Sequence, residues 1–256
     1  NAYGMRSADF SRQKAEDEYR VLVFGDSVLN GGALSDQHTL ATELLRYRLL
    51  DQHSRVTVGN VSAGSWGPGN WLGYAKTYGF FDADAVLLLI SSHDYKDNPS
   101  FAPLNPNTHP QRRPVSALWE GVTRYLPRYM PSLALIRGSG SGVNSGMPAK
   151  DEADPALAAE QGLRDLRDFL IEAQQATQQV VVIQFLERSE LQTQPKEGHF
   201  RIKQTVQAMG IALNSSETLF RSAIDAGIQP YRDNIHINVA GHALLADVLF
   251  EAINAD

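Results

Sequence analysis

The sequence predicts one α/β domain built on a doubly wound, flavodoxin-like parallel sheet of about five strands, with helices on both faces and an insertion after the third strand. Two observations carry this prediction. Four short, nearly continuous apolar runs rich in β-branched residues are typical of parallel strands covered on both faces. Segments with helical periodicity lie between these runs, and strand–helix alternation favours a doubly wound sheet.

The predicted elements alternate along residues 1–256, read as a single domain. Strands are expected at 20–24, 56–61, 85–90 and 180–186. Helices are expected at 39–50, 155–176 and 240–253, where apolar side chains recur at three- and four-residue spacing. A sheet of this kind binds ligands beyond the carboxyl ends of its strands, so the polar residues that follow each strand are the candidates for a site.

Residues 98–154 interrupt the alternation. This insertion is rich in proline, aromatic residues and arginine, and then becomes rich in glycine and serine. The second half is typical of a loop. We expect the insertion to form a lid or a substrate wall, and the alternative is a surface excursion with no catalytic part.

Composition excludes several classes of function. The net charge of −6 gives no reason to expect affinity for nucleic acids or anionic membranes. The chain has no cysteine, which excludes disulfides, thiolate zinc sites and thiol nucleophiles. No apolar run approaches the ~20 residues that span a bilayer. The chain starts at Asn1 with a polar segment unlike a signal peptide, so we expect it to begin after a removed signal or anchor.

Ser27 is the candidate nucleophile. It ends the tripeptide Gly25-Asp26-Ser27 at the carboxyl end of the first predicted strand, where its hydroxyl would face the ligand crevice. The alternative is that Ser27 is an ordinary turn or N-cap residue.

Asp233 and His236 are the candidate base and its partner. A serine nucleophile needs a neighbouring base, and the base needs an acceptor that orients it. A short loop with an aspartate three residues before a histidine can supply both groups. The alternative is that the two side chains only stabilise their own loop.

Two further loops follow the second and third predicted strands. The first loop contains Gly64, Ser65, Trp66 and Gly67, and its glycines let backbone N–H groups approach a ligand closely. The second loop, residues 91–98, gathers polar groups where an apolar strand stops. Each could be an ordinary turn or a solvated loop. In a doubly wound sheet, however, these positions and Ser27 converge, which favours one common site.

These residues resemble the SGNH (GDSL-type) hydrolases, a family of acyl esterases. Gly25-Asp26-Ser27 matches the first family block, and Asp233-Asn234-Ile235-His236 matches the last. The resemblance covers most of the chain outside the insertion. It implies that Ser27 is the nucleophile and donates its backbone N–H to the oxyanion, that His236 takes the proton, and that Asp233 orients His236.

The middle family blocks are altered. Ser65 stands where the family has a glycine donor, and His93 stands where it has an asparagine donor. The resemblance implies that the backbone of Ser65 and the imidazole of His93 complete the oxyanion hole, which would make it pH-sensitive. Asn98 is an alternative donor. The remaining expected substrate contacts are Asp26, Gly64, Trp66 and Gly67.

The resemblance implies acyl transfer from an ester without a metal or organic cofactor. We expect deacetylation of a carbohydrate or polysaccharide through an acyl-enzyme, and polysaccharide O-acetylation by the same triad is the alternative. Stacking by Trp66, Trp71 or Trp119 would suit a glycan, although the same aromatics could belong to the core. A periplasmic or secreted location in bacteria is also implied.

Three rival interpretations remain. Ser65 could be the nucleophile of an α/β-hydrolase elbow, although Pro68 and its flanking glycines are expected to delay the helix that an elbow requires. A metal-dependent phosphoesterase would need ligands gathered from distant segments. Its candidate ligands are Asp26, His93, Asp94, Asp97, His236 and His242. A non-catalytic glycan-binding module would keep the groove and lose turnover.

Overall fold

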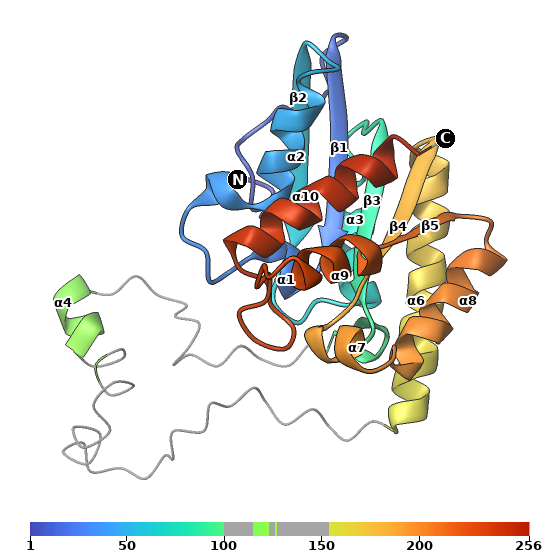
Figure 1. Cartoon of the computed structure of the whole chain (residues 1–256). Coiled ribbons are helices and arrows are strands. Elements are labelled where there is room, and N and C mark those ends of the chain that lie inside the picture. The colour runs from blue at the N-terminus through green and yellow to red at the C-terminus, as the bar shows by residue number, and fades with distance from the viewer. Residues whose placement is uncertain (100–114, 123–125, 127–153, 256) are drawn as a thin grey trace. The chain divides into compact units, whose positions relative to one another are not determined.

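A computed structural model describes residues 1–99, 115–122, 126 and 154–255 (Figure 1). The chain divides into two compact units, one formed by residues 1–99 and 154–256 and the other by residues 100–153. In the first unit the strands are β1 Glu18–Gly25, β2 Arg55–Ser62, β3 Ala85–Ser91, β4 Gln179–Phe185 and β5 Ala212–Ser215.

The sheet confirms the predicted fold class. Its order is β2-β1-β3-β4-β5, and every neighbouring pair is parallel. The chain winds outward from β1 to β2 in one direction and from β3 to β5 in the other. The direction of winding therefore reverses between β1 and β3, and ligands of doubly wound sheets bind at such a switch point.

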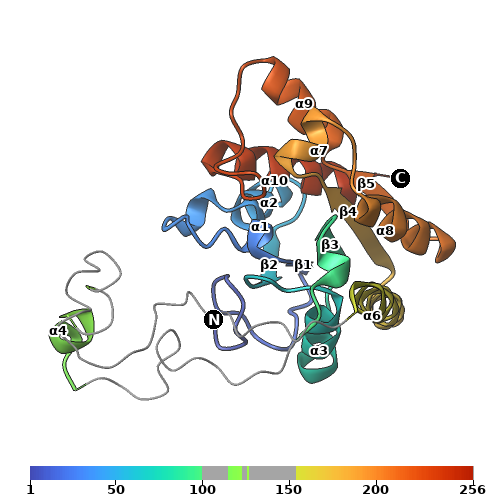
Figure 2. The same ribbon diagram turned by 90° about the horizontal axis from the view of Figure 1, so that it is seen from below.

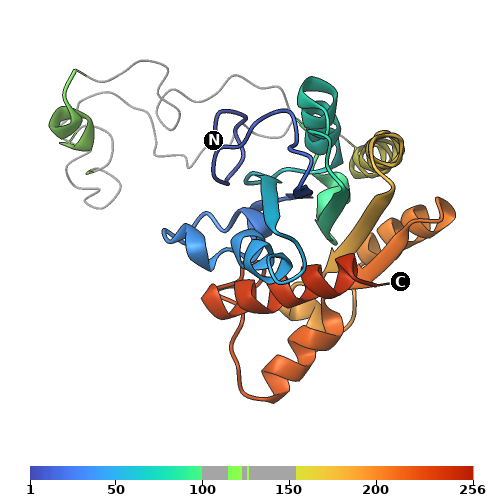
Figure 3. The ribbon, with the colours of Figure 1, turned by 90° about the horizontal axis from the view of Figure 1, so that it is seen from above.

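Helices cover both faces of the sheet (Figures 2 and 3). The helices of this unit are α1 Ser27–Asn30, α2 Ala41–Leu49, α3 Pro68–Tyr78, α6 Pro155–Ala176, α7 Arg188–Gln192, α8 Glu197–Ala208, α9 Glu217–Asp225 and α10 Val239–Ile253, with 3-10 turns at Gln37–Thr39 and Asp94–Lys96. Apolar residues of α2, α9 and α10 pack on one face and those of α3, α6 and α8 on the other. Alternate residues of β1 serve the two faces, because successive strand side chains point to opposite sides: Val21 and Val23 face the first group, whereas Leu22 and Phe24 face the second.

Most predicted elements lie where the pattern placed them. The four apolar runs are β1 to β4, and α6 has the predicted bounds. β5 is a four-residue edge strand in which no residue is fully buried, so it has no apolar run to reveal it. The prediction for Pro68 was wrong: it is the first residue of α3, where a proline loses no helical hydrogen bond, so the helix starts without delay.

A buried ion pair lies within β1. Arg20 is fully buried, and its Nε lies 2.8 Å from Glu18 Oε1. The same guanidinium donates to the carbonyl of Phe81 at 2.7 Å. Paired in this way, a charged residue can occupy a strand that is otherwise apolar.

The insertion lies largely outside the described residues, and its expected role as a lid or substrate wall stays a prediction. In this second unit the structure describes helix α4 Ala117–Glu120, where Trp119 is exposed. Among the described residues, no helix is long and apolar enough to cross a membrane.

Candidate active site

Ser27 opens α1 directly at the end of β1. Asp26 caps this helix, because its Oδ1 accepts a hydrogen bond from the backbone N–H of Val28 at 2.8 Å. A Cβ at Gly25 would lie 2.8 Å from the side chain of Leu29, so the tight strand-to-helix turn requires glycine. The turn places Ser27, half-buried, at the carboxyl end of β1 beside the switch point of the sheet.

The structure brings Ser27, His236 and Asp233 into one hydrogen-bonded chain. Ser27 Oγ lies 3.0 Å from His236 Nε2. On the other side of the ring, His236 Nδ1 lies 2.9 Å from Asp233 Oδ2. An imidazole held between a hydroxyl and a carboxylate can take a proton from the first while the second stabilises its positive charge.

The loop itself fixes the Asp233 carboxylate. Oδ1 accepts backbone N–H groups from Ile235 at 2.9 Å and His236 at 2.7 Å. An antiparallel bridge between Tyr231 and Ile237 closes the loop. Burial opposes ionisation, but these N–H groups and the imidazole outweigh it and hold the pKa of Asp233 well below its usual range. Asp233 is therefore ionised at neutral pH, as an orienting carboxylate must be.

The loop after β2 has different environments for its four candidate residues. Ser65 is exposed and has φ of +57°, a left-handed conformation that favours glycine. Gly64 is also exposed. Gly67 is buried, and a Cβ there would lie 2.2 Å from the carbonyl oxygen of Asp97, so this glycine permits close backbone packing. Trp66 is half-buried and its ring contacts Tyr74, with the centroids 6.0 Å apart.

The expected glycan contact of Trp71 was wrong. Trp71 is fully buried, and its Nε1 donates to the carbonyl of Gly25 at 2.9 Å. An indole enclosed in this way belongs to the core beneath the Gly25–Ser27 turn and cannot stack on a substrate.

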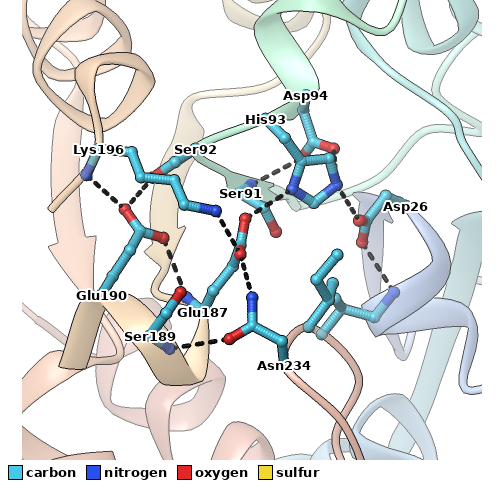
Figure 4. Close-up of polar contacts among 12 residues, drawn as sticks. Asp26, Ser91, Ser92, His93, Asp94, Glu187, Ser189, Glu190, Lys196 and Asn234 are labelled. Atoms are coloured by element: carbon cyan, nitrogen blue, oxygen red, sulfur yellow. Dashed lines mark hydrogen bonds and ion pairs between the residues drawn. The ribbon is translucent and has the colours of Figure 1, made fainter. Parts of the chain in front are cut away.

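The His93 imidazole lies among three carboxylates (Figure 4). Nε2 is 3.5 Å from Asp26 Oδ2 and 3.4 Å from Asp94 Oδ1, whereas Nδ1 is 3.2 Å from Glu187 Oε1. Burial opposes protonation, but contacts with Asp26 and Glu187 and the charge of Asp94 raise the pKa of His93 to about 11. The ring is therefore an imidazolium at neutral pH with both nitrogens directed at carboxylates.

Asn98, the alternative donor, is engaged by α6. Its Nδ2 donates to the carbonyl of Ala158 at 2.8 Å, which places the amide against the start of that helix. The side chain therefore anchors the end of the loop after β3 to a helix.

One group among the described residues has the spacing of a cation site. Asp26, His93 and Asp94 each offer a ligand atom, and these atoms lie within 4.8 Å of one another. The other ring nitrogen of His93, Nδ1, lies 3.2 Å from Glu187 Oε1. His242, another ligand of the phosphoesterase interpretation, is fully buried and accepts a hydrogen bond from Ala41 N at 3.2 Å.

A small pocket adjoins Ser27. Its lining consists of Ser27, Val28, Gly31, Gly32, Ala33, Leu34, Arg232, His236 and Ile237. The Arg6 guanidinium supports its wall by donating to the carbonyls of Asn30 at 2.5 Å and Gly31 at 2.6 Å. The sequence motifs did not reveal this wall, because backbone and small side chains form most of it.

Glu187 and Asn234 are neighbours of the site that the sequence analysis missed. Asn234 lies within the Asp233–His236 segment, and its Nδ2 donates to Glu187 Oε2 at 2.7 Å (Figure 4). The position of Glu187 just beyond β4 was the available signal, since polar residues at the carboxyl ends of strands gather at the same edge.

Comparison with known proteins shows which solved structures this chain resembles. No protein-family model and no curated protein matches the chain. Among solved structures, it is similar to a lipolytic protein of the G-D-S-L family from Veillonella parvula, at 13% identity and a TM-score of 0.52, over 93% of this chain and 100% of that one. A mutant acetyl-xylooligosaccharide esterase from Geobacillus is similar at 13% identity and a TM-score of 0.54, over 93% of this chain and 95% of that one. An α/β hydrolase from the metagenome of Lake Arreo, Spain, is similar at 13% identity and a TM-score of 0.55, over 92% of this chain and 94% of that one.

These likenesses establish the class of fold. The chain is an α/β protein with a five-stranded parallel sheet, and it shares this fold with G-D-S-L-type esterases.

Proposed function

We propose that the protein is a serine ester hydrolase that removes acetyl groups from a carbohydrate through an acyl-enzyme. The observation that carries the proposal is the chain of hydrogen bonds from Ser27 Oγ through His236 to Asp233. This arrangement of nucleophile, base and orienting carboxylate activates a serine hydroxyl.

Acylation begins when Ser27 Oγ attacks the ester carbonyl carbon and His236 Nε2 takes the hydroxyl proton. Asp233 stabilises the imidazolium that forms. The tetrahedral intermediate then breaks its bond to the alcohol oxygen, which leaves with the proton from His236. The products of this half-reaction are a free sugar hydroxyl and an acetyl group on Ser27.

Deacylation repeats the chemistry with water. His236 accepts a proton from a water molecule as the oxygen attacks the acetyl carbon. The bond to Ser27 Oγ breaks, the serine regains its proton from His236, and acetic acid leaves and ionises to acetate in solution.

Backbone N–H groups of Ser27 and Ser65 are the proposed oxyanion donors. Ser27 N lies at the start of α1, where backbone N–H groups have no partner within the helix. The left-handed conformation of Ser65 is one that glycine adopts readily, so the backbone path of a glycine is retained although the residue has changed.

The substrate class rests on two further observations. Gly31, Gly32 and Ala33 line the pocket beside Ser27, and these small residues suit a short acyl chain. Solved esterases of the same fold carry descriptions as acetyl-xylooligosaccharide and acetyl xylan esterases, and another is active on acetylated mannans. We extend the acetylated-carbohydrate substrate to this chain.

The test is hydrolysis of an aryl acetate by the wild type, Ser27→Ala and Ser65→Ala. Ser27→Ala should abolish turnover without changing the circular-dichroism spectrum or the melting temperature. Ser65→Ala keeps the backbone donor and should retain activity. Full activity in Ser27→Ala would refute the nucleophile assignment.

A second assay addresses the acyl acceptor. Acetate release from an acetylated xylo- or manno-oligosaccharide should proceed in water alone. Addition of an unacetylated acceptor glycan tests transfer, and an acetylated acceptor in place of free acetate would favour the O-acetyltransferase alternative.

A further inference from the structure

We propose that His93 is a positioning residue that clamps the nucleophile turn to the loop carrying the base, and that it does not donate to the oxyanion. The inference rests on the proposed function, since it assigns a role in the same site. It concerns a chain of contacts that runs from Asp26 through His93 and Glu187 to Asn234 (Figure 4).

The first arm of the clamp reaches the nucleophile. Asp26 is almost fully buried and precedes Ser27 directly. Its Oδ1 caps α1 through Val28 N, whereas Oδ2 accepts no hydrogen bond from the described residues and faces His93 Nε2 at 3.5 Å. The imidazole of His93 therefore contacts Asp26, the residue that caps α1 and orients the Ser27 turn.

The second arm reaches the base loop. His93 Nδ1 lies 3.2 Å from Glu187 Oε1, and Glu187 Oε2 accepts from Asn234 Nδ2 at 2.7 Å. The α7 backbone also holds Asn234, because Arg188 N donates to its carbonyl at 2.8 Å and Ser189 N donates to its Oδ1 at 3.1 Å. Asn234 immediately follows Asp233, so Glu187 holds the loop that orients His236.

Charge suits His93 to this role. Asp26 and Asp94 are buried beside Nε2, and a neutral ring would present a lone pair to one of its carboxylate neighbours. An imidazolium donates from both nitrogens and attracts the carboxylates on both sides. Burial opposes the ionisation of Glu187, but its contacts with His93 and Lys196 outweigh it and lower its pKa.

The contacts of His93 argue against an oxyanion role. Each ring N–H already faces a carboxylate, and a carboxylate is a stronger acceptor than an ester carbonyl. A donor to the oxyanion would have to leave Asp26 or Glu187 and thereby unpair a buried charge, at a large cost. The ring is therefore better placed to hold the two segments than to bind the reacting oxygen.

Clamping has a clear catalytic purpose here. Ser27 and His236 belong to segments 209 positions apart, yet their side chains must keep a 3.0 Å contact. A displacement of about 1 Å at such a contact can cost roughly 100-fold in rate. A link between the two segments preserves this geometry.

The test is a double-mutant cycle of His93→Asn and Glu187→Gln, measured as kcat and KM with an aryl acetate. Asparagine restores an amide donor but is too short to bridge both carboxylates, and glutamine removes the charge of Glu187. We expect each variant to lower kcat at least ~10-fold with little change in KM, and the double variant to lose little more, because both break the same link. Glu18→Gln, which disrupts the remote buried pair with Arg20, is the matched control and should lose stability but keep kcat.

Retention of wild-type kcat in Glu187→Gln would overturn the clamp. A gain in kcat in His93→Asn would also overturn it, and would support a role for the side chain at position 93 as an oxyanion donor. His93→Arg adds a further discrimination, since it keeps the cation and should retain more kcat than His93→Asn.

Amide hydrogen exchange tests the clamp by a measurement that does not depend on activity. His93→Asn should speed exchange in residues 27–31 and 233–237 together, whereas Glu18→Gln should not. If the wild type hydrolyses no acyl ester, the proposed function fails while this exchange result still decides the clamp. Unchanged exchange in both segments of a folded His93→Asn variant would refute it.

Discussion

Ser27 Oγ and His236 Nε2 lie 3.0 Å apart although 209 positions separate the two residues. The sheet order explains how they meet. Ser27 follows β1 at the switch point, and the loop before α10 returns to the same edge of the sheet, where the carboxyl ends of the parallel strands gather (Figure 1). The contact between Ser27 and His236 therefore depends on the long-range topology of the sheet. Single substitutions can test what each residue around it contributes.

Asp233→Asn should lower kcat by roughly 10³- to 10⁴-fold. An amide can donate to the imidazole and favour the wrong tautomer, and it cannot stabilise the imidazolium that forms during proton transfer. Steady-state kinetics with an aryl acetate checks the effect, and an unchanged melting curve shows that the loop remains folded. A variant within tenfold of wild type would show that Asp233 is not the orienting group.

Ser65→Gly should raise the free energy of unfolding by up to about 1 kcal/mol and keep most of the activity. The φ of +57° at Ser65 costs a residue with a Cβ more than it costs glycine, and the greater freedom of glycine in the unfolded chain offsets part of the gain. Urea unfolding with Ser65→Ala as the control measures the difference. Loss of activity in Ser65→Gly would show that the serine side chain has a role of its own.

The sequence predicted strands β1 to β4 and the segments that bring Ser27, Asp233 and His236 together, because their signals are local. Each of β1 to β4 is an apolar run, and Asp233 and His236 are close enough in sequence to share one loop. β5 was not located, because it is a short edge strand with no fully buried residue.

The surroundings of His93 could not be predicted in the same way. Its three carboxylate neighbours come from the ends of β1, β3 and β4, and sequence spacing does not reveal which of them face the ring. The burial of Trp71 was likewise hidden, because α3 was not predicted to begin at Pro68.

Arg20→Met should lower the free energy of unfolding by about 3–5 kcal/mol without changing kcat in the folded fraction. The change leaves the buried Glu18 carboxylate without its 2.8 Å partner and the Phe81 carbonyl without its donor. Urea unfolding measures the loss, and the double variant with Glu18→Gln should recover part of it, because no buried charge is then unpaired. A single variant as stable as wild type would contradict this assignment.

His242 should make the protein less stable as the pH falls from about 6.5 toward 4. Burial, aided by the charge of Arg6, lowers the pKa of His242 to about 4, whereas an unfolded histidine titrates near pH 6.5. Between these values the unfolded chain binds the proton and the folded chain does not, so the free energy of unfolding falls as the pH is lowered. Because His242 is fully buried, the loss should reach ~3 kcal/mol near pH 4.

Urea unfolding of wild type and His242→Gln between pH 7 and pH 4 measures this contribution. Glutamine can still accept from Ala41 N but has no proton to gain, so the variant should lose less stability over this interval. Groups such as His199, whose pKa is also lowered mainly by burial, remain in both proteins and cancel in the difference. His38→Gln, at an exposed histidine, is the matched control. Parallel pH profiles for wild type and His242→Gln would show that His242 does not titrate as its burial requires.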